Sequence, residues 1–351
     1  MPRHVSPAQS SPRSWLTPVL VASTLRDANY AHGMLLLRDG SRTRWAARMS
    51  AINARRAPPF LGAGARVALV APAGPLRGQA DVDRAIGNVR TLGWEPIVAP
   101  HALERTGYFA GDDDSRAADF ESALRDPRID GVWCLRGGYG AMRLLDRIDW
   151  GVLRVAAKPV LGYSDVTALH GAIARQAGII SYHAPTARAE LSDFSRVSLA
   201  RALSDGGDPC GVAADARVIR PGRATGRLEG GNLAVLSALV GTPYFPSLDG
   251  AILVLEDVNE AIYRIDRMFA QLHLSGALRG TRAIVFGQCT NCPEESDDGA
   301  RRLDDVLYEV ADRLRIPCLA GVPVGHVPEQ WTVPLGAVAE IDAEGKVLRV
   351  R

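Results

Sequence analysis

The sequence contains a serine at a position where its hydroxyl could act as a nucleophile. Ser164 follows the apolar segment 158–161, which predicts a short strand, and precedes apolar residues at helical spacing over 166–174. A serine at such a strand-to-helix corner has its hydroxyl outside the carboxyl end of a sheet, near the amide groups of a helix N-terminus. Serine is also among the most frequent N-cap residues, and the corner by itself favours a plain helix cap.

An acid and a histidine further along the chain occupy comparable settings. Glu256 ends the apolar segment 251–255, and His326 stands in the glycine- and proline-containing segment 322–328. Taken singly, a solvated acid at a strand end and a hydrogen-bonded loop histidine are ordinary features. Together with Ser164 they supply the parts of a Ser-His-Glu relay. In such a relay the imidazole takes the serine proton, and the carboxylate fixes the imidazole tautomer.

A relay of this kind also needs amide N–H donors for the oxyanion. The Asp165 amide directly follows the serine. A second donor is expected from Gly137 or Gly138 in the turn 136–140, because glycine lets the backbone approach a substrate carbonyl. This turn lacks the Gly-Lys-Ser/Thr ending of a phosphate loop and the spacing of a dinucleotide fingerprint, so no organic cofactor is expected. His183 is a rival general base, or else a residue that shapes the pocket.

Composition and charge place the chain among globular proteins. It carries 41 basic and 39 acidic residues, a formal net charge of +2 and 47% hydrophobic residues, which gives no argument for a nucleic-acid partner or an anionic membrane surface. No segment approaches the ~20 apolar residues that a transmembrane helix needs. The five cysteines are few and scattered, which favours a reducing compartment. Cys289 and Cys292 have CxxC spacing but no second pair and no nearby histidine, so they predict two incidental thiols rather than a zinc site.

The rhythm of predicted elements divides the chain into four regions. Residues 1–60 are rich in arginine and lack a strand–helix rhythm, and we expect a poorly ordered extension with Met49 as a candidate true start. Over 61–190, short apolar strands alternate with helices, which predicts a parallel, doubly wound sheet whose ligands gather at the carboxyl ends of the strands. Glycine and proline break up 191–222, which we interpret as a linker, and 223–351 predicts a second domain with a more mixed sheet.

Six short motifs occur in one order along the chain, and together they resemble the LD-carboxypeptidase family of serine peptidases. This family includes murein tetrapeptide carboxypeptidases and microcin C self-immunity peptidases. The resemblance spans about residues 66–341. The motifs are Arg136-Gly-Gly-Tyr-Gly140, Gly162-Tyr-Ser-Asp165, Glu229-Gly-Gly-Asn-Leu233, Leu255-Glu-Asp257, Tyr263-Arg-Ile-Asp-Arg-Met268 and Gly325-His326.

The resemblance implies Ser164 as nucleophile, His326 as base and Glu256 as the carboxylate, with an oxyanion hole formed by the Asp165 amide and a glycine amide of the turn 136–140. It further implies a flavodoxin-like N-terminal domain that carries the serine, and a smaller C-terminal domain that carries the other two residues. The site would lie between these domains, without metal or organic cofactor, and many family members are homodimers. Typical members remove the terminal D-alanine of a cytoplasmic murein tetrapeptide during cell-wall recycling, cutting after the L-centre of diaminopimelate.

The substrate pocket is predicted in less detail than the relay. A murein peptide needs a contact for its terminal carboxylate, for which Arg136 is a candidate. The further candidates for substrate binding are Tyr139, Glu229 and Asn232. The chain also departs from the family pattern in two places: the continuation of the histidine motif over 325–331, and an alanine in the segment 181–185 where the family often has glycine.

Two alternative functions stay open on the sequence alone. A self-immunity hydrolase of peptidyl or aminoacyl nucleotides would gain from an aromatic residue that stacks on the base. The chain has no tryptophan between Trp150 and Trp331, which disfavours this alternative, although Phe194 could stack. A binding protein that lost the reaction is disfavoured because the serine, glutamate and histidine of the matching motifs are all present.

Overall fold

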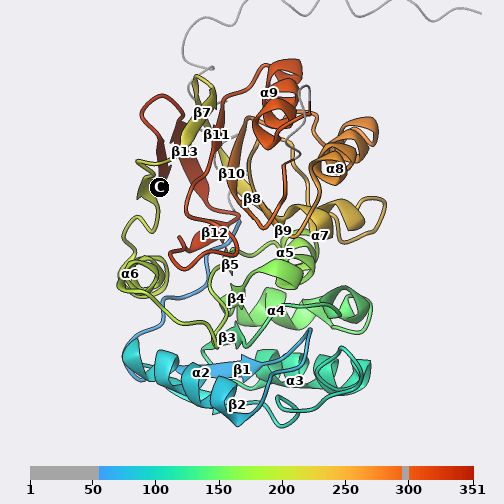
Figure 1. The fold of residues 1–351 in the computed structure, drawn as a ribbon. Helices are drawn as coiled ribbons and strands as arrows, with labels where there is room; N and C mark the ends of the chain where they lie inside the picture. Colours follow the sequence, from blue (N-terminus) through green and yellow to red (C-terminus); the bar gives the residue numbers. More distant parts are fainter. Residues whose placement is uncertain (1–54, 295–299) are drawn as a thin grey trace, which may run out of the picture. The chain divides into compact units, whose positions relative to one another are not determined.

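The computed structural model describes residues 55–294 and 300–351, and both ranges belong to the same structural unit. Two β-sheets with helices packed on them make up these residues (Figure 1). Of the extension predicted over 1–60, residues 1–54 with the candidate start Met49 lie outside the described residues. Within the two described ranges, no helix is long and apolar enough to cross a membrane.

The first sheet has the strand order β12-β5-β4-β3-β1-β2. Its first five strands in the chain are β1 (Arg66–Val70), β2 (Glu95–Val98), β3 (Gly131–Cys134), β4 (Val160–Gly162) and β5 (Ser181–His183). All four pairings among these strands are parallel. The order 2-1-3-4-5 is that of flavodoxin-like folds, so the predicted doubly wound sheet is confirmed.

Helices cover both faces of this sheet, because each helix buries one apolar stripe against it. One face is covered by α3 (Asp113–Arg125), α4 (Trp150–Ala156) and α5 (Thr167–Ala172), with the short turns η1 (Ala141–Leu144), η2 (Ser164–Val166) and η3 (Ile173–Ala177). The opposite face is covered by α2 (Gln79–Thr91) and by α6 (Asp193–Ala200) with its continuation η4 (Arg201–Asp205). In α2, for example, Val82, Ala85 and Val89 recur at helical spacing and are buried.

The second sheet is mixed, as predicted, and has the order β6-β14-β13-β8-β9-β10-β11-β7. Its strands are β6 (Gly211–Val212), β7 (Arg217–Arg220), β8 (Arg223–Asn232), β9 (Ala251–Val258), β10 (Ala283–Thr290), β11 (Cys318–Ala320), β13 (Val338–Asp342) and β14 (Val347–Val350). The central four, β8 to β11, are parallel, and the strands outside them pair antiparallel. In the described residues it has eight strands, against six in the first sheet.

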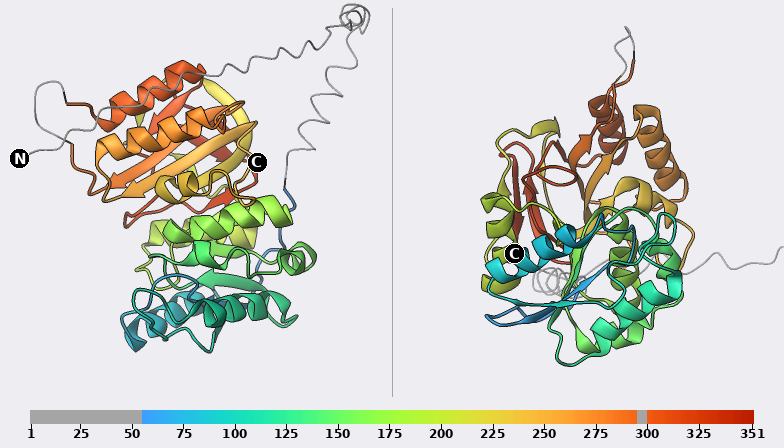
Figure 2. Two further views of the ribbon diagram at one scale, coloured as in Figure 1. Left: turned by 90° about the vertical axis from the view of Figure 1, so that its right-hand side faces the viewer. Right: turned by 60° about the horizontal axis from the view of Figure 1, so that its bottom comes forward.

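One face of the second sheet packs against three helices. These are α7 (Leu233–Ala238), α8 (Ile262–Leu274) and α9 (Leu303–Leu314), of which α8 and α9 lie side by side in Figure 1. The opposite face packs against the segment around Trp331 and Val333. Figure 2 shows the N-terminal half, blue to green, adjoining the C-terminal half, yellow to red.

The range 191–222, which the sequence predicted as a linker, instead contains regular structure. Helix α6 packs on the first sheet, while β7 pairs with β11 and β6 pairs with β14 at the two edges of the second sheet. Edge strands of two to four residues have too little apolar patterning to be recognised from sequence, because half their surface faces solvent.

The C-terminal part of the chain also contributes a strand to the first sheet. β12 (Val333–Leu335) pairs antiparallel with β5, and His183 lies opposite Val333. His326 is therefore carried on the segment that passes from β11 in the second sheet to β12 in the first. This crossing brings the histidine motif to the carboxyl ends of β4 and β9.

Candidate active site

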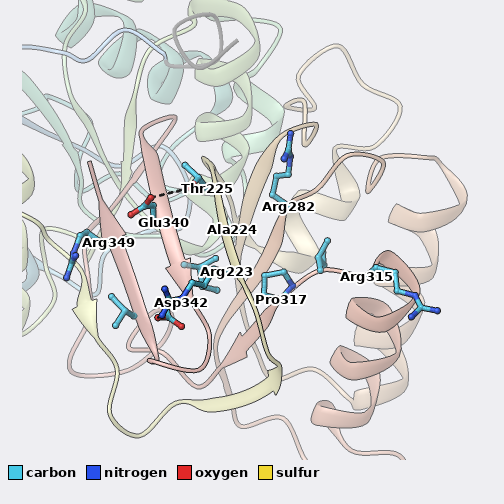
Figure 3. A pocket seen from close by; sticks show the side chains of 12 residues that line it. Arg223, Ala224, Thr225, Arg282, Arg315, Pro317, Glu340, Asp342 and Arg349 are labelled. Atoms are coloured by element: carbon cyan, nitrogen blue, oxygen red, sulfur yellow. Dashed lines mark hydrogen bonds and ion pairs between the residues drawn. The ribbon is translucent and has the colours of Figure 1, made fainter. Parts of the chain in front are cut away.

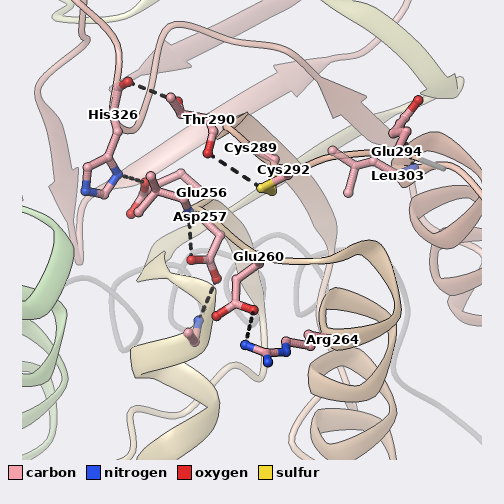
Figure 4. Close-up of a disulfide and its surroundings, with 12 residues drawn as sticks. Glu256, Asp257, Glu260, Arg264, Cys289, Thr290, Cys292, Glu294, Leu303 and His326 are labelled. Carbon is pink, nitrogen blue, oxygen red and sulfur yellow. Dashed lines mark hydrogen bonds and ion pairs between the residues drawn. A yellow bond between two sulfur atoms is a disulfide. The ribbon is translucent and has the colours of Figure 1, made fainter.

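Ser164, His326 and Glu256 lie in hydrogen-bonded succession. The Ser164 Oγ is 3.2 Å from His326 Nε2. The His326 Nδ1 is 2.8 Å from Glu256 Oε2, a contact that Figure 4 shows. An ionised carboxylate accepts and does not donate, so Nδ1 carries a proton and Nε2 presents its lone pair to the serine hydroxyl. The Glu256 side chain is fully buried, whereas that of His326 is 23% exposed, so solvent reaches the imidazole but not the carboxylate. This is the geometry that a nucleophile with an oriented general base requires.

The serine stands in an unusual backbone conformation at the carboxyl end of β4. Its φ is +65°, in the left-handed region that residues other than glycine rarely adopt. Ser164 is the first residue of η2, whose N-cap is Tyr163, and this turn has no side-chain cap hydrogen bond. The plain helix cap that the corner favoured on sequence grounds is therefore not what the structure shows.

A buried histidine that the sequence analysis did not single out supports this corner. The Nε2 of His170 donates to the Gly162 carbonyl at 2.8 Å, so Nδ1 accepts from the Ser181 hydroxyl at 2.9 Å. Burial lowers the pKa of His170 to about 4, which keeps the ring neutral at pH 7. An ionisable residue within a mostly apolar run, 166–174, was the available signal.

The glycine turn lies directly against the nucleophile. A Cβ on Gly137 would lie 2.9 Å from the Ser164 Cβ and 3.1 Å from its Oγ, so this close approach requires glycine. The Gly137 carbonyl accepts a hydrogen bond from the Gly74 amide at 3.1 Å, which fixes the turn. The Asp165 carboxylate joins turn and corner, because its Oδ2 accepts from the Ala141 amide at 2.7 Å. The backbone groups predicted to bind an oxyanion thus come from two segments tied to each other.

Asp165 gives the stability of the protein a defined dependence on pH, which Asp165→Asn is expected to remove. Burial raises the pKa of Asp165 to about 6 in the folded protein, above the value of ~3.9 in an unfolded chain. The folded state therefore binds the proton more tightly, and stability is lost as pH rises from about 4 to 6. The difference between the folded and unfolded pKa values corresponds to a loss of about 3 kcal/mol in the free energy of unfolding. An asparagine still accepts from the Ala141 amide but does not titrate.

Urea unfolding of both proteins at pH 4, 5, 6 and 7 measures the effect. The variant should lose less stability over this range than the wild type does. The pKa of Asp257 is also raised to about 6 by burial, but it contributes the same slope to both proteins and cancels in the comparison. Identical pH dependence in the two proteins would contradict the prediction.

The segment that holds His326 is fixed by a glycine and a threonine. Gly325 has a φ of +115°, and a Cβ there would lie 2.8 Å from the Glu256 Cβ and 2.9 Å from its Oε2. The Thr290 hydroxyl donates to the His326 carbonyl at 2.9 Å (Figure 4). The Tyr163 ring lies against the imidazole, with ring centroids 4.8 Å apart. These contacts hold the imidazole in place between the serine and the glutamate.

Gly325→Ala is expected to lower kcat with a much smaller effect on folding. The new Cβ overlaps Glu256 and must displace either the carboxylate or the histidine, and a misplacement of ~1 Å can cost about 10²-fold in rate. Gly241→Ala is the matched control, because Gly241 also has a positive φ (+86°) but nothing within 4 Å of its added Cβ. Steady-state kinetics and thermal unfolding of both variants make the comparison; equal loss of activity in both would contradict it.

The cysteine pair at the end of β10 differs from the sequence prediction. Cys289 and Cys292 form a disulfide rather than two separate thiols. Their Cα atoms are 5.5 Å apart, within bridging range, and Asn291 between them has a φ of +54°, which turns the chain back on itself. The bridge brackets Thr290 and so lies next to the contact that holds His326 (Figure 4).

His183, the rival base, makes no hydrogen bond to the serine in the described residues. It lies buried in β5, and neither ring nitrogen has a hydrogen-bond partner among the described residues. Burial lowers the pKa of His183 to about 3, so the ring is neutral at pH 7. Its ring meets the edge of Tyr163 with centroids 5.8 Å apart, which places it behind the residue that packs on His326.

Two of the residues proposed for substrate binding are buried and have internal partners. Glu229 forms an ion pair with Arg227 at 2.6 Å and accepts from Arg55 at 3.0 Å. Asn232 is the N-cap of α7, where its Oδ1 accepts from the Val235 amide at 3.1 Å. Its Nδ2 donates to the Asp257 carboxylate, also at 3.1 Å.

The other two lie in the glycine turn and are accessible. Tyr139 is exposed and forms a ring cluster with Tyr108 and Phe109. Arg136 is half-buried, and its Nη1 donates to the Pro75 carbonyl.

A separate open pocket of about 760 Å³ lies on the second sheet (Figure 3). Four arginines and two acidic residues line it, and one pair of these, Arg223 and Asp342, is in contact at 2.7 Å. None of its lining residues belongs to the Ser164 site.

Comparison with known proteins shows matches to both halves of the chain. Residues 67–184 match the LD-carboxypeptidase N-terminal domain, and residues 225–341 match the LD-carboxypeptidase C-terminal domain. A Streptomyces coelicolor protein named as a carboxypeptidase is 39% identical over 309 residues, covering 82% of this chain and 93% of its own length. The murein tetrapeptide carboxypeptidase of Pseudomonas aeruginosa is 33% identical over 304 residues, which cover 81% of this chain and 94% of the Pseudomonas protein. The microcin C7 self-immunity protein of Escherichia coli is 27% identical over 280 residues, which cover 69% of this chain and 80% of the Escherichia coli protein.

Solved structures agree with these matches. The muramoyltetrapeptide carboxypeptidase of Oxalobacter formigenes has a TM-score of 0.73 at 30% identity, covering 81% of this chain and 97% of its own. The microcin C7 self-immunity protein in complex with aspartyl sulfamoyl adenosine has a TM-score of 0.76 at 22% identity, covering 84% and 97%, and at that identity it shows the fold alone. The resemblance carried by the six motifs is confirmed: the chain belongs to the LD-carboxypeptidase family.

Proposed function

We propose that this protein is a serine carboxypeptidase that hydrolyses the LD-peptide bond before the terminal D-alanine of murein tetrapeptide in cell-wall recycling. The observation that carries the proposal is the hydrogen-bonded succession of Ser164, His326 and Glu256 in a member of this family. The relatives from Pseudomonas aeruginosa and Oxalobacter formigenes support the choice of substrate. A cytoplasmic location and a homodimer belong to the same proposal and rest on the family resemblance.

In the first half of the proposed reaction, Ser164 Oγ attacks the carbonyl carbon of the diaminopimelate residue. His326 Nε2 takes the serine proton, and the buried Glu256 carboxylate stabilises the imidazolium that results. The oxyanion accepts hydrogen bonds from the Asp165 amide and from the amide of Gly137 or Gly138. The carbon–nitrogen bond then breaks, and D-alanine leaves with the proton that His326 returns to its amine.

In the second half, a water molecule attacks the acyl-enzyme carbonyl. His326 removes a proton from the water and returns it to Ser164 Oγ as the ester bond breaks. The products are free D-alanine and the murein tripeptide. The exposed part of the imidazole gives the water its route to the ester.

A product assay tests this proposal. The purified protein is incubated with murein tetrapeptide and, separately, with an aminoacyl sulfamoyl adenosine, and release of D-alanine and of the nucleoside is followed. The proposal expects D-alanine release. Release of the nucleoside alone would reject the substrate, and reaction with neither would favour a binding protein that lost the reaction.

A second candidate function is hydrolysis of peptidyl or aminoacyl nucleotides, favoured by the aromatic cluster beside the glycine turn. Tyr108 and Tyr139 are both more than half exposed, and their ring centroids are 5.7 Å apart. Stacking of a base on such a ring is worth ~1–3 kcal/mol. Phe194, the residue that the sequence offered for this role, is 39% exposed on α6. The nucleoside arm of the assay decides between the two substrates.

A further inference from the structure

We propose that Arg188, together with Arg136, binds the C-terminal carboxylate of the peptide and so restricts the enzyme to free chain ends. This inference rests on the proposed function and specifies how the same site would recognise its substrate. Arg188 was not among the residues that the sequence analysis singled out. Its position, its unfilled hydrogen-bonding capacity and the local excess of positive charge carry the argument.

The first observation is the path of the chain that leaves β5, which crosses the carboxyl ends of β4 and β3. The Ala184 amide donates to the Gly162 carbonyl at the end of β4 (3.1 Å), and the Arg188 amide donates to the Leu135 carbonyl at the end of β3 (3.4 Å). The nucleophile corner follows the first of these strands, and Arg136 follows the second. The crossing thus sets the backbone of Arg188 beside that of Arg136, at the edge of the sheet that carries the serine.

Side chains hold this crossing in place. The Trp133 indole Nε1 donates to the Pro185 carbonyl at 2.8 Å, and the side-chain Nδ2 of Asn88 donates to the Ala187 and Ala189 carbonyls, both at 2.8 Å. The segment is therefore built into the fold on both sides of Arg188, and the start of its side chain is fixed.

The second observation is that the Arg188 guanidinium is incompletely bonded. Its side chain is 25% exposed, and its Nε is buried without a hydrogen-bond partner among the described residues. Its nearest carboxylate, Asp81, is 3.7 Å away, while the oxygens of Asp81 accept three hydrogen bonds from Arg77. Burial is the main cause that lowers the pKa of Arg188, and the charge of Arg136 adds to it. An arginine nevertheless stays protonated in proteins, so an anion bound here would relieve the cost of that buried charge.

The third observation is the balance of charge. Asp81 lies within ion-pair distance of Arg77, Arg84 and Arg188, so one carboxylate serves three guanidinium groups, and Arg136 adds a fourth. Guanidinium groups match carboxylates through paired, charge-assisted hydrogen bonds. The terminal D-alanine offers one such carboxylate, whereas a peptide amide or an internal peptide bond offers none. The phosphate of a nucleotide would share this anionic chemistry, and the experiment separates the two sources.

The experiment compares murein tetrapeptide with its C-terminal carboxamide in wild type, Arg188→Gln and Arg136→Gln, and uses an aminoacyl nucleotide as a third substrate. Wild type should strongly prefer the free carboxylate. In each variant kcat/KM for the free tetrapeptide should fall about 10- to 100-fold, the range expected for a lost hydrogen bond to a charged group, mainly through KM. Cleavage of the carboxamide should change little, so that the ratio between the two substrates collapses. Arg188→Lys, which keeps the charge but not the planar fork, should lie in between.

Arg90→Gln is the matched control, because Arg90 is an exposed arginine on α2 that has no part in this cluster. It should keep the wild-type ratio. Wild type that cleaves both substrates equally, or variants that retain the wild-type ratio, would overturn the role of the arginines and leave the carboxypeptidase standing. The wild-type comparison needs no variant, so poor folding of one variant does not remove the test. Cleavage of an aminoacyl nucleotide with no action on either peptide would instead overturn the proposed function and this inference with it.

Discussion

Replacing Ser164 by alanine is expected to lower kcat for D-alanine release from murein tetrapeptide by about 10⁴- to 10⁶-fold, the range typical for loss of a triad nucleophile. The hydroxyl lies 3.2 Å from the His326 Nε2, and no other hydroxyl in the described residues is bonded to that nitrogen. Without it there is no acyl-enzyme, and the remaining catalysis must come from substrate positioning and the oxyanion donors alone. The change is expected in kcat, with KM much less affected.

The same three residues should behave as one unit. His326→Ala is expected to cost about as much as Ser164→Ala, and the double variant no more than either, because members of a relay are strongly non-additive. Ser192→Ala is the control: Ser192 caps α6 by accepting from the Ser195 amide at 3.2 Å, so its loss should reduce stability and spare kcat. A Ser164→Ala variant with wild-type activity would remove the serine mechanism for any substrate.

The parts of the fold that sequence predicted best are those with a strong local signal. Apolar strands alternating with helices from Arg66 onward predict a doubly wound sheet, and the described strand order confirms it. Helix α8 carries a signal of the same kind, because Ile265, Phe269 and Leu272 mark one apolar face at helical spacing. Strand β12 could not be predicted to join the first sheet, because its three residues pair with β5, about 150 positions earlier in the chain.

The sequence predicted the three relay residues of the candidate site, because the proposed chemistry requires particular residue types. Ser164 begins η2 after β4, Glu256 lies near the end of β9, and His326 lies in the segment between β11 and β12. The structure brings all three together. Residue patterns without the family resemblance left His183 as a rival to His326, since both follow apolar segments, and burial distinguishes the two in the structure. Nor could it foresee that Glu229 is occupied by two arginines, since one of them, Arg55, is far away in the chain.

Residues that support the site were hardest to find, because their signals are contacts rather than motifs. His170 gives no pattern beyond one ionisable position in a mostly apolar run, yet it donates a hydrogen bond to the Gly162 carbonyl. Arg188 lies in the loop after β5, and it is relevant to the site only because this loop crosses the end of β3 and places Arg188 beside Arg136. The cysteine pair was recognised by its spacing, but bonding depends on how the chain turns at Asn291. In each case a tertiary contact supplies the missing information.

Glu256→Gln is expected to lower kcat by about 10⁴-fold, the loss typical when the carboxylate of a serine-peptidase triad becomes an amide. Glu256 is fully buried and accepts from His326 Nδ1 at 2.8 Å, which leaves Nε2 free to take the serine proton. A glutamine can present its NH₂ group to Nδ1 instead, and the imidazole then carries its proton on Nε2, where it cannot act as the base. The substitution also removes the negative charge that stabilises the imidazolium. KM should change little, since Glu256 lies behind the histidine.

Asp257→Asn is the matched control for this change, because it converts the next carboxylate along β9 into an amide on the opposite face of the strand. Asp257 accepts from the Ala234 amide at 2.9 Å and the Val258 amide at 2.8 Å. In the described part of the chain it is Glu256, and not Asp257, that is hydrogen-bonded to His326. It should therefore alter stability and its pH dependence while sparing kcat. Steady-state kinetics on murein tetrapeptide, with thermal unfolding of each variant, separates the two residues. Equal losses of kcat in both variants would mean that either substitution lowers kcat by disturbing the local structure at the end of β9. Glu256 would then have no specific role in orienting the imidazole.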